Sequence, residues 1–201
     1  MSSRNFITVV WTSLLLAFGS MQVCRANDAG IHPAHLADAD LPAVERLITA
    51  GADVNARHIS GTSALHHLVT VSADMGSIGQ RMRKGKIYFA GQWSATGHLR
   101  LAELLLASGA EVNLEDDLGQ TPLHIAALTG HSDAARFLLA NGAEVNVEDT
   151  AKRTPSDLAK WSATDEAIAE LASATGQKVD ARAIRVRVKI MLDLLRAYGA
   201  K

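Results

Sequence analysis

The chain has 201 residues, of which 48% are hydrophobic and only 4% aromatic, and its formal net charge is −1. A charge balance this close to neutral gives no overall field that would recruit nucleic acid. Few aromatic residues among many alanines and leucines favour an all-helical protein packed through small helix–helix interfaces over one with a single large core.

Residues 1–26 have the features of a secretory signal peptide. Arg4 supplies a positive charge, an apolar run follows over residues 6–18, and small residues precede a cleavage point after Ala26. The apolar run is short for a membrane span, which leaves an uncleaved anchor as the alternative. Cys24, the one cysteine, lies in this segment, so no intramolecular disulfide can form. We therefore expect a mature domain over residues 27–201, periplasmic or secreted.

Residues 30–59 are predicted to form a first pair of helices. Pro42 begins the second helix of the pair, because proline lacks an N–H group and is tolerated in a helix's first turn. Val44 and Ile48 then fall on one face at helical spacing. The sequence GADVN follows at 51–55 as a turn. We interpret this unit as an N-terminal cap.

The second unit, 60–118, is interrupted by an insert. It opens with GTSALH at 61–66 and resumes with a helix expected over residues 99–107. The insert between them, about residues 72–96, is both basic and aromatic; these residues are Arg81, Arg83, Lys84, Lys86, Tyr88, Phe89 and Trp93. Insertions in repeat proteins map to loops. A surface insertion that packs back on the helices, a partner-binding loop and a disordered loop all remain open.

The third unit, 119–151, is the most regular. Thr121 and Pro122 begin a first helix that Gly130 ends, and a second helix is expected over Ser132–Ala140. The sequence GAEVN follows at 142–146, and it also occurs at 109–113, before this unit begins. Two helices this short cannot bury a core alone, so the unit must stack on neighbours of its own kind.

The fourth unit, 152–176, repeats this pattern more weakly. Thr154 and Pro155 follow Thr121 and Pro122 at the same spacing that separates the two GAEVN sequences, and a second helix is expected from Asp165 to Leu171. A final helix is expected over residues 181–197, within a segment from 178 to 198. Its apolar stripe comprises Ile184, Val188, Met191 and Leu195, widened by Val186, Ile190 and Leu194; its basic face comprises Arg182, Arg185, Lys189 and Arg196. We expect a C-terminal cap, with an interaction surface as the alternative.

These motifs resemble those of the ankyrin repeat family, whose unit is a turn plus two helices with a period of about 33 residues. The TPLH motif is complete at 121–124, with GH at 130–131 and GAEVN after the second helix. The resemblance covers roughly residues 30–175. It implies an all-α ankyrin-repeat solenoid of about four stacked helix-turn-helix repeats, namely the four units above, with a C-terminal capping helix.

The resemblance also implies structural rather than chemical roles for the histidines. His66 and His124 occupy the TPLH position, where the family's histidine bonds to backbone between repeats, and His98 and His131 begin second helices. The remaining histidines are His32, His35, His58 and His67, and none belongs to a recognised zinc spacing. The acidic turns at 115–117 and 148–149 lack the pattern of a calcium loop, and no hydrolase or phosphate-binding motif occurs. We therefore expect no enzyme activity, cofactor or metal.

What remains is protein binding through a concave surface of turn tips and first helices. Alignment to the family gives the candidate contact residues, which are Arg57, Ile59, Ser60 and Thr62; Glu115, Asp117, Leu118, Gln120, Leu128 and Thr129; and Glu148, Thr150, Ala151, Arg153 and Trp161. Trp161 is either an exposed anchor for a partner or packed beneath the last helix. We expect a monomeric, non-enzymatic scaffold or adaptor with one protein partner. The alternatives are an inhibitor or immunity protein that neutralises an envelope enzyme or toxin, and a membrane-surface structural protein.

Overall fold

The computed structural model describes residues 31, 36, 40–71, 97–175 and 179–201. The α-helices in these ranges are α3 (Leu41–Thr49), α4 (Ala64–Val71), α6 (Gly97–Ala107), α7 (Pro122–Thr129), α8 (Ser132–Ala140), α9 (Pro155–Ser162), α10 (Asp165–Thr175) and α11 (Ala181–Ala197), with a 3-10 turn η2 (Ile59–Gly61). The predicted all-α solenoid is confirmed. The predicted signal peptide, the insert 72–96, His32 and His35 lie outside the described residues. Within the described ranges, no helix is both long and apolar enough to cross a membrane.

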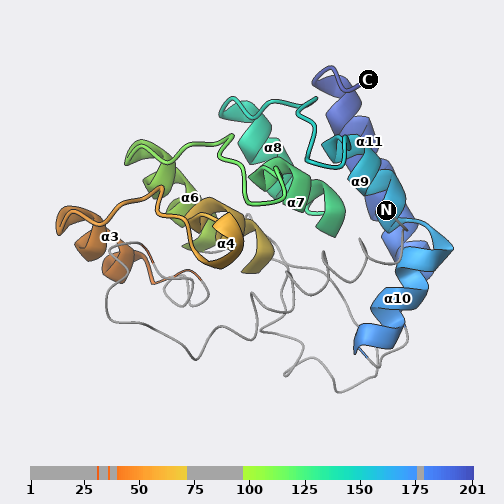
Figure 1. Cartoon of the computed structure of the whole chain (residues 1–201), viewed down its shortest axis with the longest axis horizontal. Coiled ribbons are helices and arrows are strands. Elements are labelled where there is room, and N and C mark those ends of the chain that lie inside the picture. The colour runs from red at the N-terminus through yellow and green to blue at the C-terminus, as the bar shows by residue number, and fades with distance from the viewer. Residues whose placement is uncertain (1–30, 32–35, 37–39, 72–96, 176–178) are drawn as a thin grey trace.

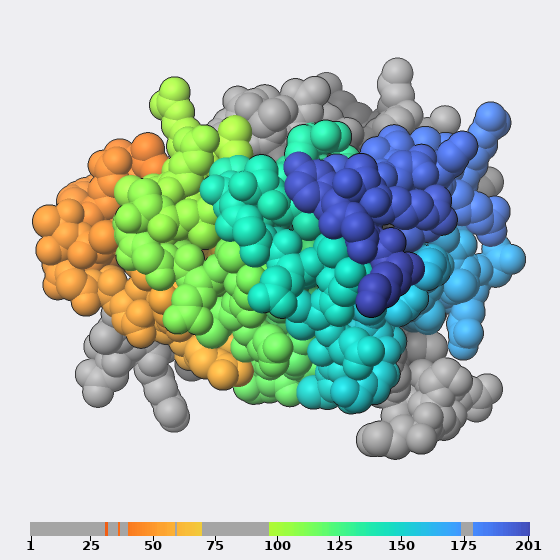
Figure 2. All heavy atoms as spheres, turned by 90° about the horizontal axis from the view of Figure 1, so that it is seen from above, coloured from red at the N-terminus to blue at the C-terminus, as the bar shows by residue number. Residues whose placement is uncertain are grey.

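The helices form two rows that run along the solenoid. Figure 1 shows α3, α6, α8 and α11 in one row and α4, α7 and α9 in the other. The space-filling view in Figure 2 shows the units following one another in chain order from one end of the molecule to the other. Each repeat therefore contacts chiefly its sequence neighbours, as in other repeat proteins.

Local sequence signals set the boundaries of α7 and α8. Pro122 lies in the first turn of α7, and the side chains of Thr121 and His124 form a reciprocal capping box there. Gly130 ends α7 in the left-handed conformation, with a φ of 74°, which a residue without a Cβ adopts at no steric cost. The predicted bounds of both helices are confirmed.

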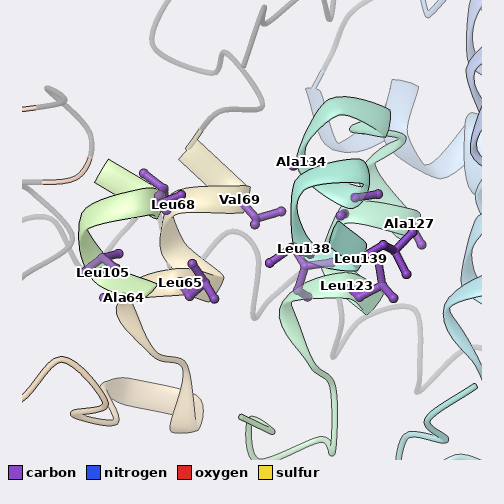
Figure 3. Packing of buried hydrophobic residues seen from close by; sticks show 14 of the residues in the cluster. Ala64, Leu65, Leu68, Val69, Leu105, Leu123, Ala127, Ala134, Leu138 and Leu139 are labelled. Atoms are coloured by element: carbon purple, nitrogen blue, oxygen red, sulfur yellow. The ribbon is translucent and has the colours of Figure 1, made fainter. Parts of the chain in front are cut away.

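The core is a continuous apolar layer between the two rows of helices. Leu138 of α8 is fully buried, as predicted, beside Leu123 of α7. In Figure 3, Val69 of α4 points across the gap between units toward α8. Leu105 of α6 belongs to the same buried cluster. No single repeat encloses this layer, so each unit depends on its neighbours for burial.

A repeated asparagine ties each unit to the next. Its side-chain N–H group donates to the carbonyl of the glycine that follows the next second helix; the pairs are Asn55 to Gly109 (2.9 Å), Asn113 to Gly142 (3.1 Å) and Asn146 to Gly199 (3.0 Å). Its side-chain oxygen accepts from a backbone N–H shortly after that glycine; these donors are Glu111 (2.8 Å), Glu144 (2.9 Å) and Lys201 (3.1 Å). The turn after α11 is therefore equivalent to the turns after α6 and α8.

Helix α11 thus takes the place of the second helix of the fourth repeat. It packs against both α8 and α9, whereas α10 contacts α9. The sequence predicts α11 with correct bounds, but it assigns the second-helix position to α10, and the bonds of Asn146 correct that assignment. The spacing of the turn glycines shows that the repeat period is interrupted twice. Gly51 and Gly109, and likewise Gly142 and Gly199, are much farther apart in sequence than Gly109 and Gly142.

The outer side of α11 carries a charge where α8 carries a buried apolar residue. Counting back from the turn glycines Gly142 and Gly199, Arg196 occupies the position of Leu139, which is buried in α8. Arg196 is exposed instead. A charged residue at the stacking position favours water over a further repeat, so α11 both completes the fourth repeat and caps the solenoid.

One part of the predicted apolar stripe of α11 is wrong. Val188, Met191, Leu194 and Leu195 are buried as expected, and Ile184 is half-buried. Val186 and Ile190, however, are 53% and 48% exposed. They lie on the side of α11 that no other described helix covers.

Candidate protein-binding surface

Buried carboxylates hold the turn tips of the third and fourth repeats in shape. One carboxylate oxygen of Asp116 accepts from the backbone N–H groups of Leu118 and Gln120, both at 2.8 Å. Asp149 binds Ala151 (2.8 Å) and Arg153 (3.0 Å) in the same way. Burial raises the pKa of Asp116, although these hydrogen bonds favour its charged form. The tips are therefore fixed by their own hydrogen bonds before any partner binds.

Adjacent tips are also bonded to one another. The backbone N–H of Asp117 donates to the carbonyl of Ser60 (3.1 Å), and that of Thr150 donates to the carbonyl of Leu118 (3.0 Å). Arg57 forms an ion pair with Asp117 at 3.2 Å across the same junction. Both partners of that pair are largely exposed, so it contributes little stability. The three tips form one connected row.

The TPLH histidines connect the first helices to this row, as the family resemblance implies. His66 Nε2 lies 2.9 Å from the carbonyl of Gln120, and His124 Nε2 lies 3.2 Å from the carbonyl of Arg153. In His66, Nδ1 accepts the backbone N–H of Ser63 (3.2 Å), so the proton of the neutral ring is on Nε2 and is donated to the next repeat. Burial lowers the pKa of His66 to about 4.

Aspartate replaces the histidine in the last repeat. Asp157 lies at the TPLH position, one repeat after His124. Its carboxylate accepts from the backbone N–H (3.2 Å) and hydroxyl (2.8 Å) of Thr154. These bonds reproduce the contacts that the histidine makes within its own repeat. The histidine also donates to a carbonyl of the next repeat, but the described chain has no fifth repeat to supply one. A carboxylate, which only accepts hydrogen bonds, therefore serves equally well here.

The histidines at 58 and 67 have structural contacts as well. His58 Nε2 lies 2.9 Å from the carbonyl of Ile31, and His67 Nε2 lies 3.0 Å from the hydroxyl of Thr62. These contacts place them within the N-terminal part of the solenoid.

The structure separates the predicted contact residues by exposure. The exposed ones are Arg57, Glu115, Asp117, Glu148, Thr150 and Ala151; the half-buried ones are Ser60, Thr62, Leu118, Leu128, Thr129, Arg153 and Trp161. Gln120 is only 2% exposed. A side chain this buried cannot contact a partner, so Gln120 does not belong to an accessible surface. The backbone of Ile59 lies in η2, and its side chain falls outside the described parts of the chain.

Some half-buried candidates are already engaged within the fold. Thr129 donates its hydroxyl hydrogen to the carbonyl of Ile125 at 2.7 Å. Arg153 forms an ion pair with the buried carboxylate of Asp149. Leu118, Leu128 and Trp161 are the remaining apolar candidates, and their partly accessible surface is available for contact.

Sequence reasoning missed one tip residue, Lys152. It is exposed and pairs with Glu148 at 3.3 Å. Its φ is 63°, in the left-handed region that glycine prefers. Gly119 stands one repeat earlier with a φ of 70°, and this register could have shown that Lys152 stands at a turn tip.

Comparison with known families agrees with this geometry. A family model for ankyrin repeats in three copies matches residues 89–183. Ankyrin repeats generally mediate protein–protein interaction and act as binding modules without catalysis. The equivalent tips, the inter-repeat histidines and the asparagine bonds recur with the repeat along the described solenoid. Residues 89–183 of the chain therefore belong to the ankyrin-repeat family.

Proposed function

We propose that this chain is a non-enzymatic scaffold that binds one folded protein in the periplasm or outside the cell. The proposed contact surface, called here the tip surface, consists of the exposed turn-tip residues and the accessible parts of Leu118, Leu128 and Trp161. The interaction role follows from the family, whereas the compartment rests on the signal-peptide pattern of residues 1–26.

The observation that carries the proposal is the equivalence of Leu128 and Trp161. They are one repeat apart and hold the same position in α7 and α9, two first helices that pack side by side. Both are half-buried. We therefore expect two neighbouring apolar side chains with accessible surface, of the kind that forms the centre of a binding site.

The turn tips that precede these two first helices carry mainly acidic exposed residues. Glu115, Asp117 and Glu148 are exposed, and two of them are paired with cations of the tips, Asp117 with Arg57 and Glu148 with Lys152. Charged rim residues chiefly affect the association rate. The proposed partner therefore presents an apolar centre flanked by basic groups, and its association with this chain slows as salt is added.

The test is to purify the chain from its native source, identify a stoichiometric protein partner, and measure its affinity by titration calorimetry. Variants of the tip surface are compared with a variant on the exposed side of α8. Loss of affinity in both sets, or in neither, would place the binding site elsewhere.

A further inference from the structure

We propose that α11 carries a second docking surface, which binds an amphipathic helix with acidic flanks on a partner protein. This surface, called here the α11 seam, is the row Ala183, Val186, Ile190, Asp193 and Ala197. Its members follow one another at alternating steps of three and four along the helix. That spacing is typical of the contact row of a coiled coil.

Every member of the seam is exposed. Val186 and Ile190 are the large apolar members and, with Tyr198, are the exposed large apolar residues of the described chain. Exposed apolar side chains at adjacent turns of one helix form a continuous ridge. A single exposed apolar residue would need no explanation, but a ridge in register does.

The apolar character of the seam is particular to α11. Counting back by the same interval from each turn glycine, Ile190 is equivalent to Arg100 in α6 and to Asp133 in α8. Both equivalents are exposed and charged. The solenoid therefore keeps this row polar where water covers it and changes it to apolar in the last helix.

The length of α11 makes the seam accessible. Helix α11 has 17 residues, whereas α8 has nine, so the N-terminal turns of α11 extend beyond the end of α8. Figure 1 shows α11 as the long helix at the end of the solenoid, with α10 near its N-terminal end. The small side chains of Ala183 and Ala197 at the two ends of the seam allow another helix to approach closely.

Charges beside the seam define the chemistry of its partner. Arg182, Arg185, Lys189 and Arg196 are all exposed along one flank. Arg185 pairs with Asp165, and Arg196 pairs with Asp193. In the described part of the chain, Arg182 and Lys189 form no ion pair. Charges that flank such a row select the partner helix, and two available cations select acidic flanking residues.

The same features argue against two other occupants. Interfacial membrane helices bury a broad apolar face with Trp, Phe or Leu, whereas the seam offers Val186 and Ile190 as its large apolar residues. A second copy of this chain in an antiparallel arrangement would bring the basic flanks together, and like charges at such flanks are repulsive. A helix from another protein meets neither difficulty.

The experiment uses the full mature chain and two synthetic helical peptides with the same leucine seam. One peptide has glutamate and the other has lysine at the flanking positions, and binding is followed by fluorescence anisotropy. We expect the glutamate peptide to bind at least about 10-fold more tightly, a difference that two charge pairs can supply. Val186→Ser with Ile190→Ser should weaken that binding at least about 10-fold. Arg100→Ser, at the equivalent exposed position of α6, should not.

Charge reversal gives an independent arm. Arg182→Glu with Lys189→Glu should invert the preference toward the lysine peptide, with circular dichroism showing an unchanged fold. The proposal is overturned if neither peptide binds at up to about 1 mM. Two other results would also overturn it. In one, Val186→Ser with Ile190→Ser abolishes binding to phosphatidylglycerol vesicles but not to peptide. In the other, the same variant abolishes a dimer that the unaltered protein forms in sedimentation.

Discussion

The side chain of Asn146 donates a hydrogen bond to the carbonyl of Gly199, far along the chain, at a distance of 3.0 Å. The same side chain accepts the backbone N–H of Lys201 at 3.1 Å. These two bonds give the C-terminal turn the place that the turns of earlier repeats occupy. They also identify α10, with its connections, as a segment inserted between the two helices of the fourth repeat.

Removal of these bonds should loosen the end of the solenoid. Asn146→Ala should destabilise the protein by about 1–2 kcal/mol, because two hydrogen bonds of ordinary strength are lost. Amide hydrogen exchange should rise in α11 before it rises in α7 and α8. Ser132→Ala, on an interior helix and without an asparagine bond, serves as the control. Equal exchange throughout the chain would mean that α11 does not unfold as a separate unit.

Leu138 should be the most sensitive position of the third repeat. Leu138→Ala should cost about 2–5 kcal/mol, because a fully buried side chain leaves a cavity between helices. Urea unfolding followed by circular dichroism measures this. Ala140→Ser on the exposed side of the same helix should change stability by less than about 0.5 kcal/mol. Equal midpoints for the two variants would contradict the assigned core.

Acid should weaken the contact between the second and third repeats. The pKa of His66 is about 4 in the folded protein and 6.5 in its unperturbed form, chiefly because burial disfavours the charged ring. The unfolded chain therefore takes up a proton below pH 6.5 that the folded chain cannot. The stabilising contribution is complete above pH 6.5 and is lost as the pH falls to about 4, for a total of roughly 3 kcal/mol.

Urea unfolding between about pH 7.5 and pH 4 tests this effect. His66→Gln keeps a side chain that can donate to Gln120 and accept from Ser63 but cannot titrate. The raised pKa of Asp116 acts in the opposite sense, because the folded protein binds that proton more readily. The difference in unfolding free energy between wild type and His66→Gln at each pH cancels the Asp116 contribution, since both proteins contain Asp116. A difference that stays constant with pH would show that His66 titrates normally in the folded state.

Export can be tested without knowledge of the partner. If residues 1–26 are a signal peptide, the mature protein should begin at Asn27 and occur in the soluble envelope fraction or the medium. N-terminal sequencing and intact mass decide this. A full-length chain in the cytoplasm would exclude the proposed compartment while leaving the binding role in place.

If the tip surface is the binding site, substitutions in it should weaken partner binding. Trp161→Ala and Leu118→Asp should each weaken binding by more than about 2 kcal/mol, the range of interface hot spots. Titration calorimetry with the identified partner measures the loss. Arg136→Ala, on the exposed side of α8, should leave affinity within about 0.5 kcal/mol of wild type. Normal binding by both tip variants would exclude this surface.

Local sequence signals determined much of this fold. Pro122 and Gly130 delimit α7 because proline suits a first turn and glycine suits a left-handed end. The bounds of α11 follow from a sustained helical period. The roles of His66 and His124 follow from their place in a recognised motif, since the repeat fixes what lies beside them.

Tertiary structure alone decided which helices pair and which faces are covered. The sequence places α10 directly after α9, but α11 packs in the second-helix position, because an insertion separates neighbours in sequence from neighbours in space. Burial of Gln120 and exposure of Ile190 have the same origin. Periodicity identifies an apolar side of a helix, whereas exposure depends on which other element packs against that side, and that is a property of the assembled stack.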